Sequence, residues 1–163
     1  MLRFIPLAVL LLVVGCGTMP QAPPGSRFVT QPDRQPADPR AHEVVMFALG
    51  LLETGYRFGG KNPDAGFDCS GMVSYVFENA AGLRLSGSAA EIAKRGRPVS
   101  GEGLRPGDLV FFNTRNQPYS HVGIYVGNGR FVHAPSSNGK VRIDSLTSGW
   151  FATRFEEART YFD

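Results

Sequence analysis

Cysteine is nearly absent from this chain, which has only Cys16 and Cys69 among 163 residues. A framework of several disulfides, common in small exported domains, is therefore excluded. Runs of like charge are also absent, and the net charge is only +3, so neither nucleic-acid binding nor a polybasic membrane patch is indicated. No internal repeat occurs, and no closely spaced ligand pair such as CxxC or HExxH points to a metal.

The residues that are present have the composition of one ordinary globular domain. Hydrophobic residues make up 42% of the chain and charged residues 19%. The 20 glycines and 12 prolines are many for this length. They favour a body rich in strands and loops over a helical bundle.

The N-terminus has the features of an export signal. Arg3 supplies a positive charge, and an apolar stretch, too short to span a bilayer, runs from Phe4 to Val14. Val13-Val14-Gly15-Cys16 resembles the lipobox of bacterial lipoproteins, in which the cysteine is acylated and becomes the first residue of the mature chain. We therefore predict a signal peptide at residues 1–15 and a lipid on Cys16, against the alternative of an unmodified signal with a chance cysteine.

Residues 16–40 are predicted to form a tether between the lipid and the domain. The segment is rich in proline and has almost no large apolar side chains, so it cannot bury enough surface to fold. Two or more acyl chains anchor a protein stably to a membrane. Gly17 is not the aspartate that often retains lipoproteins on the inner membrane, which favours the periplasmic face of the outer membrane if the host is Gram-negative.

Residues 41–163 are predicted to form an α+β domain, with helices first and one mainly antiparallel sheet afterwards. Apolar periodicity predicts helices over 41–54, from Cys69 to near Gly82, and over 88–95. Two Asn-Gly turn signals separate the later strands. The strands are expected at 109–112, 121–126, 130–133, 140–144 and 154–161.

Cys69 is the only cysteine in this domain, and the pattern places it at the start of a helix. Unpaired backbone N–H groups and the positive end of the helix dipole favour a thiolate there. The alternative is a small buried hydrophobe, which is how most single cysteines behave.

Two histidines are predicted to lie on neighbouring strands of one hairpin. A two-residue turn at Asn128-Gly129 would set His133 opposite Ile124, with His121 near the same end of the sheet. A small bulge or twist would bring both imidazoles to one face, where one could serve a thiolate and the other orient it. Two alternatives stay open on the residues alone. The first is a zinc site formed by Cys69 with both histidines, and the second is that the histidines are ordinary strand-end residues.

From Tyr56 onward the chain resembles the NlpC-type cell-wall cysteine peptidases, a papain-like group. The resemblance covers nearly the whole domain, in the right order. Its signatures are YRFGG (56–60), GFDCSGMVSYVF (66–77), LRPGDLVFF (104–112) and SHVGIYVGNGRFVHAPSSNGKV (120–141). It implies Cys69 as nucleophile, His121 as general base and acid, and His133 as the residue that orients His121, with no cofactor and no metal.

The resemblance also implies supporting roles around the nucleophile. Tyr56 matches the family tyrosine whose hydroxyl would help to hold the oxyanion, together with a backbone N–H of Cys69 or Ser70. Asp68 and Ser70 match positions that line the substrate site. The segment Leu85–Ile92 departs from the family pattern, since it lacks the usual Pro-Arg pair and glutamine, so fine substrate preference is not carried over.

The implied substrate is the peptide stem of peptidoglycan. Two amides are candidates, the γ-D-glutamyl–diaminopimelate bond within a stem and the diaminopimelate–D-alanine crosslink between stems. Other readings are a catalytically silent lipoprotein that binds wall peptides or scaffolds hydrolases, and a papain-like amidase or acyltransferase with another substrate. A regulatory protein partner is left open.

Overall fold

The computed structural model describes residues 38–137 and 139–162. The predicted signal peptide, Cys16 and almost all of the predicted tether therefore lie outside the described residues. No helix within the described ranges is both long and apolar enough to cross a membrane.

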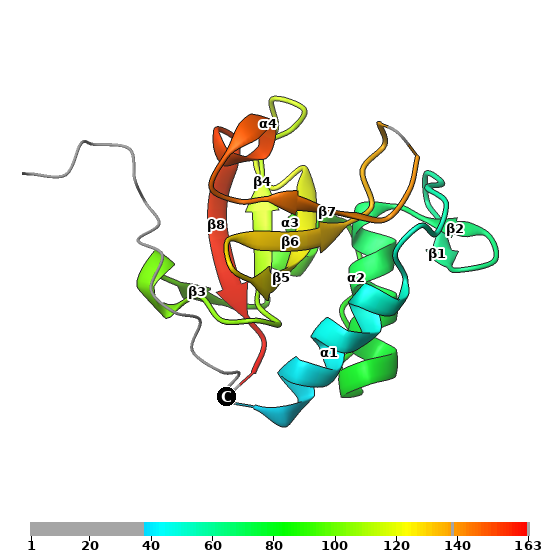
Figure 1. The fold of residues 1–163 in the computed structure, drawn as a ribbon, viewed down its shortest axis with the longest axis horizontal. Coiled ribbons are helices and arrows are strands. Elements are labelled where there is room, and N and C mark those ends of the chain that lie inside the picture. The colour runs from blue at the N-terminus through cyan, green and yellow to red at the C-terminus, as the bar shows by residue number, and fades with distance from the viewer. Residues whose placement is uncertain (1–37, 138, 163) are drawn as a thin grey trace, which may run out of the picture.

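The described chain is an α+β domain of helices packed on an antiparallel sheet, as predicted (Figure 1). The elements are α1 (Pro39–Gly50), β1 (Lys61–Asn62), β2 (Gly66–Phe67), α2 (Cys69–Ala81), α3 (Ala89–Ala93), β3 (Arg97–Val99), the 3-10 helix η1 (Gly101–Gly103), β4 (Leu109–Phe112), β5 (His121–Gly127), β6 (Arg130–His133), β7 (Arg142–Ser145), α4 (Gly149–Ala152) and β8 (Phe155–Thr160). The six-stranded sheet has the order β3-β8-β4-β5-β6-β7, and a two-stranded ribbon, β1-β2, precedes α2.

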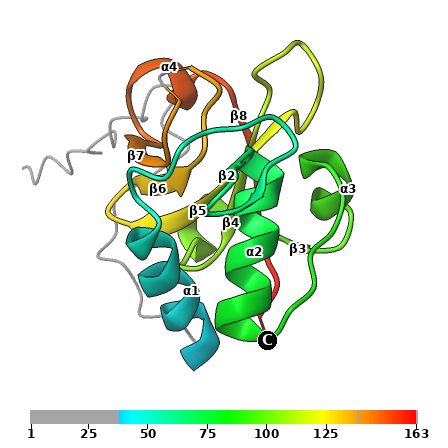
Figure 2. The ribbon, with the colours of Figure 1, turned by 90° about the vertical axis from the view of Figure 1, so that its right-hand side faces the viewer.

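The main core lies between the helices and one face of the sheet. Helices α1 and α2 lie side by side against β5, and α3 lies on the other side of α2 (Figure 2). Fully buried side chains from both layers meet there, including Val44, Met72, Phe77, Phe111 and Ile124. A second apolar cluster around Phe112, Phe131 and Phe151 covers the opposite face under α4. The sheet is therefore buried on both faces where it carries the histidines.

Helix α1 both starts and ends earlier than the sequence predicts. It begins at Pro39 because the Asp38 carboxylate accepts a hydrogen bond from Arg40 N at 2.8 Å, and proline suits the first helical position. It ends at Gly50 rather than Thr54 because the backbone that follows pairs with a distant segment: Glu53 N donates to Val141 O at 3.0 Å, and Val141 N donates to Thr54 O at 2.8 Å. That pairing has no local sequence signal.

The predicted strands are present with small shifts in their ends, whereas β1, β2 and the edge strand β3 carry no alternation that predicts them. Strand β8 pairs with β4 and β3, so the C-terminal strand is inserted into the sheet. The Asn128-Gly129 turn is confirmed, with both residues at positive φ, 53° and 66°. The second predicted turn includes residue 138, which lies outside the described residues.

The loop before Cys69 packs tightly against the first turn of α2. A Cβ added at Gly71 would lie 2.0 Å from the carbonyl oxygen of Gly60, so only glycine allows this approach. Asp68 N also donates to that same carbonyl at 3.2 Å. The glycine-rich loop therefore fixes the position from which Cys69 begins the helix.

Candidate active site

Cys69 is the first residue of α2, as predicted. Asp68 is the N-cap, and its Oδ1 accepts hydrogen bonds from Gly71 N at 2.7 Å and Ser70 Oγ at 3.1 Å. Its Oδ2 accepts one from Gly59 N at 2.9 Å, which joins the preceding loop to the helix start. Asp68 thus determines where the helix begins, in addition to facing the cleft.

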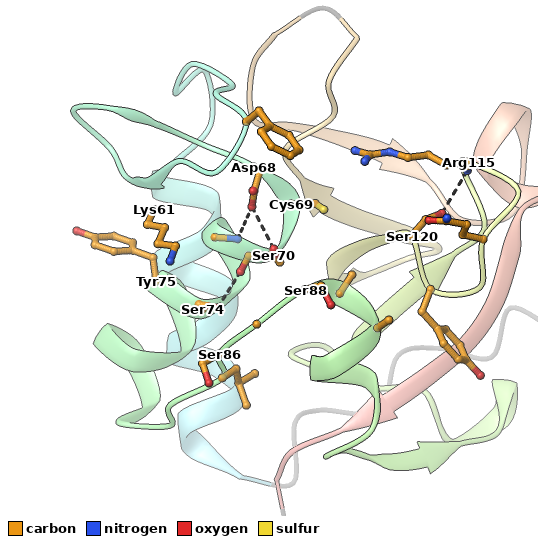
Figure 3. A pocket seen from close by; sticks show the side chains of 18 of the residues that line it. Lys61, Asp68, Cys69, Ser70, Ser74, Tyr75, Ser86, Ser88, Arg115 and Ser120 are labelled. Atoms are coloured by element: carbon orange, nitrogen blue, oxygen red, sulfur yellow. Dashed lines mark hydrogen bonds between the residues drawn. The ribbon is translucent and has the colours of Figure 1, made fainter.

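Cys69 opens into a cleft of about 920 Å³, large enough for a peptide segment (Figure 3). Tyr56, Asp68 and Ser70 line it beside Cys69, so the three residues predicted around the nucleophile come together with it. The segment 85–90, where the sequence departs from the family pattern, also lines this cleft. Its position makes it a determinant of what the cleft accepts.

The two histidines lie on the same face of the β5-β6 hairpin because of a bulge. The register shifts by one residue between Tyr125 and Gly127, and Ile124 is then opposite Val132 instead of His133. The predicted pairing of His133 with Ile124 is therefore wrong. Continued by one residue, the observed register sets His133 opposite Gly123, two positions from His121, and side chains two residues apart share a face.

Gly123 leaves the room that this arrangement needs. A Cβ at this position would lie 2.6 Å from the Phe131 ring and 3.2 Å from the Cβ of His133. The two imidazoles meet beside it, with their ring centroids 5.0 Å apart and the rings nearly perpendicular, at 88°.

A chain of hydrogen bonds runs from His121 into the sheet. Nε2 of His121 and Nδ1 of His133 are 2.7 Å apart, and Nε2 of His133 is 2.9 Å from Oδ2 of Asp144. Arg142 donates to the same Oδ2 through Nε and one terminal nitrogen, at 3.0 and 2.9 Å. His133, at the centre of this chain, is fully buried.

The Asp144 carboxylate determines the protonation pattern of both rings. A carboxylate can only accept, so Nε2 of His133 carries the proton and Nδ1 of His133 is an acceptor. Nε2 of His121 must then donate to that Nδ1. Consequently Nδ1 of His121 is unprotonated and available as a base.

Sequence analysis did not identify Asp144 or Arg142. Both are on β7, where His133 pairs with Arg142 and Phe131 with Asp144. The second Asn-Gly turn was the available signal, since its register places an acidic side chain beside the histidine strand. Arg115, in the loop between β4 and β5, lines the cleft and was also not identified.

Burial disfavours the charged forms of both the Cys69 thiol and the His121 imidazole. Desolvation, followed by the negative charge of Asp68, raises the pKa of the Cys69 thiol, against smaller lowering by hydrogen bonds from the backbone N–H groups of Val122 and Ser70. Desolvation, followed by the charge of His133, holds the pKa of His121 well below its usual value. The helix-start position predicted a thiolate, whereas burial in the structure favours a neutral thiol at Cys69 and a neutral imidazole at His121.

This balance predicts the pH dependence of Cys69 alkylation. The thiolate is the reactive form, so the rate with iodoacetamide should rise about tenfold per pH unit through neutrality. It should still be rising at the ordinary thiol pKa of 9.0, because the pKa of Cys69 is raised. The measurement is the rate constant of carbamidomethylation by mass spectrometry across this range. A plateau reached at acidic pH would instead show a preformed thiolate–imidazolium pair.

The zinc alternative does not fit the geometry. The facing nitrogens of His121 and His133 are hydrogen-bonded to each other, and the outer nitrogen of His133 is bonded to Asp144. In the described parts of the chain, no group of three or more His, Cys, Asp or Glu side chains is arranged to hold a metal ion.

Comparison with known proteins identifies the relatives of this chain. The NlpC/P60 family profile matches residues 53–160. The gamma-DL-glutamyl hydrolase of Bacillus subtilis (strain 168) is 40% identical over 128 residues, 77% of this chain and 31% of that protein. The murein DD-endopeptidase MepS/murein LD-carboxypeptidase of Escherichia coli (strain K12) is 43% identical over 104 residues, 64% of this chain and 54% of that protein.

Solved structures agree with this assignment. The NlpC/p60 domain of the peptidoglycan hydrolase SagA has a TM-score of 0.64 at 32% identity, covering 74% of this chain and 97% of that one. An NlpC/P60 family protein from Bacillus cereus ATCC 10987 has a TM-score of 0.69 at 27% identity, covering 78% of this chain and 41% of that one. This chain spans only about a third to a half of the length of the two curated relatives. The chain belongs to the NlpC/P60 family.

Proposed function

We propose that the protein is a peptidoglycan endopeptidase that hydrolyses an amide of the wall peptides by Cys-His-His thiol catalysis. The observation that carries this proposal is the hydrogen-bonded chain His121–His133–Asp144, which begins on a strand whose Val122 N–H also reaches the Cys69 thiol, at the start of a helix that opens into a peptide-sized cleft. Its relatives support the substrate class, since they are named as murein endopeptidases and a peptidoglycan hydrolase.

In the proposed mechanism, Nδ1 of His121 takes the proton from the Cys69 thiol as the sulfur attacks the amide carbon. The tetrahedral oxyanion accepts hydrogen bonds from the Tyr56 hydroxyl and from backbone N–H groups at the start of α2. His121 then gives the proton to the departing amine, and the carbon–nitrogen bond breaks to leave a thioester. Water, deprotonated by His121, hydrolyses the thioester and restores the thiol.

His133 and Asp144 have no direct part in bond breaking in this scheme. They hold the His121 ring in the tautomer that presents an unprotonated nitrogen to Cys69, and they stabilise the imidazolium that forms. Tyr56 is suited to its role because burial and the neighbouring Cys69 raise the pKa of its phenol, which keeps it a hydrogen-bond donor.

Two amides remain as candidate substrates, the γ-D-glutamyl–diaminopimelate bond and the diaminopimelate–D-alanine crosslink. We further propose that export and acylation of Cys16 hold the enzyme at a membrane, on the periplasmic face of the outer membrane in a Gram-negative host. The proline-rich segment 16–40 would let the domain reach the wall from that anchor.

Digestion of purified peptidoglycan sacculi tests the proposal. The full chain should release or convert muropeptides, and mass spectrometry should show a new amine and a new carboxyl group at one amide, which identifies the bond. Enzyme pretreated with iodoacetamide is the matched blank and should leave the sacculi unchanged. If the untreated enzyme leaves the muropeptides unchanged, the alternative of a catalytically silent lipoprotein is favoured. If it hydrolyses only amides outside the wall peptides, the alternative of an amidase with another substrate is favoured.

A further inference from the structure

Arg115 is a cation in the cleft to which no role has been given. It belongs to the loop that joins β4 to β5, and it lines the same cleft as Cys69. Figure 3 shows its side chain extending from this loop across the pocket toward Cys69, from the side opposite Asp68 and Ser70. A substrate bound over the thiol would therefore lie between α2 and the Arg115 guanidinium.

The loop that carries Arg115 is anchored at several points. Ser120 Oγ accepts hydrogen bonds from Thr114 N at 2.8 Å and from Arg115 N at 3.2 Å. Figure 3 shows the second of these bonds. Tyr119 is bound to strand β8, because its N–H donates to Glu156 at 2.6 Å and its hydroxyl donates to Glu157 at 2.7 Å. An anchored loop presents its side chain at reduced entropic cost on binding.

The charge of Arg115 is not neutralised by a carboxylate of the described residues. By contrast, Arg84 pairs with Glu78 and Arg159 with Glu157, both at 3.0 Å. The Arg115 guanidinium is within hydrogen-bonding reach of the Tyr56 hydroxyl. Its charge is among the smaller contributions that lower the pKa of Tyr56, Cys69 and His121, so the guanidinium lies close to the groups over which a substrate would bind.

Peptidoglycan stems offer an anion that matches this cation. A γ-linked D-glutamyl residue keeps its α-carboxylate free, and in a crosslink the diaminopimelate carbon that bears the scissile nitrogen also bears a carboxylate. Arginine binds a carboxylate with two parallel hydrogen bonds, which suits it to planar recognition beside a reacting bond. Resting on the proposed function, we infer that Arg115 binds the free carboxylate of one of the two residues joined by the scissile amide and selects stems in which that carboxylate is not amidated.

The test compares matched muropeptide substrates. One set has all carboxylates free, a second has the D-glutamyl α-carboxylate converted to a carboxamide, and a third has the diaminopimelate carboxylate amidated. The full-length wild type should lose about 10- to 100-fold in kcat/KM on one amidated set, the loss expected for one charged hydrogen-bonded contact, and the affected set identifies the carboxylate.

Variants assign the loss to Arg115. Arg115→Gln should lower kcat/KM on the free acid by a similar factor and leave the affected carboxamide unchanged, so that the two substrates become equal. Arg115→Lys should keep part of the preference, since the charge stays and the two-pronged geometry is lost. Arg130→Gln, which changes an exposed arginine of β6, is the control and should discriminate like the wild type.

Each failure has a distinct meaning. Equal wild-type rates on all three sets would overturn the inference and leave the endopeptidase proposal standing. If Arg115→Gln lowers all rates equally and keeps the preference, the inference also fails, because Arg115 would then act on the transition state. No cleavage of any set would count against the proposed function instead. The comparison of wild-type rates holds even if a variant does not fold.

Discussion

Replacement of Cys69 by alanine is expected to lower kcat/KM for muropeptide release by on the order of 10,000-fold or more, as for other enzymes that lose their nucleophile. Without the sulfur, no thioester forms, and His121 has no nucleophile to activate. The measurement is the rate of product formation from sacculi, followed by chromatography and mass spectrometry of the muropeptides.

The fold should survive this change because Cys69 contributes only a small thiol, half-buried at the edge of the core. Thermal unfolding of the variant should therefore resemble that of the wild type. Asn79→Ala is a matched control on the same helix, since this exposed side chain donates only to Tyr75 O in the last turns of α2. Asn79→Ala should release muropeptides at a rate within a few-fold of the wild type. Equal products from Cys69→Ala and the wild type would remove Cys69 as the nucleophile.

Replacement of Asp144 by alanine is expected to lower kcat by about 100- to 1,000-fold with little change in KM, because the orienting partner of a catalytic histidine is lost. Nothing would then hold the proton on Nε2 of His133, and Arg142 would be left without its carboxylate partner. The kcat of Asp144→Asn should lie between those of the wild type and Asp144→Ala. An amide oxygen still accepts these hydrogen bonds but carries no charge to stabilise the imidazolium.

The pH profile distinguishes this role from a structural one. Asp144 raises the pKa values of both His133 and His121, against the opposing effect of burial. Its removal should therefore shift the acidic limb of kcat/KM to lower pH, while the maximum rate falls. The control is Asp64→Asn, which changes an exposed carboxylate between β1 and β2. It should change neither the acidic limb of the profile nor the maximum rate. If Asp144→Ala keeps the kcat and the pH profile of the wild type, the proposed role of the hydrogen-bonded chain is wrong.

The catalytic residue types and their elements are predictable from the sequence because their signals are local. Cys69 is at a helix start, since the apolar periodicity after it and the turn residues before it define that helix within a few residues. The Asn128-Gly129 turn, likewise local, places His121 and His133 on adjacent strands. Motif resemblance then gave roles for these three residues and for Tyr56.

The functional geometry depends on contacts between distant segments, which no local pattern encodes. The bulge at Val126 shifts the register by one residue, and this shift alone determines whether His133 shares a face with His121 or points to the other side. Asp144 meets His133 only through the register of β6 with β7. Helix α1 ends at Gly50 because backbone pairing with Val141 replaces its last predicted turn.

The charge state of Cys69 shows most clearly the difference between what local sequence determines and what the packing of distant segments determines. By itself, the sequence determined that a cysteine begins a helix, a position whose dipole favours a thiolate. Only the tertiary structure determined how deeply the sulfur is buried and that the Asp68 carboxylate, which caps the helix, lies beside it. Desolvation depends on all the chain segments packed around a group, so at Cys69 it outweighs the local dipole and favours the protonated thiol.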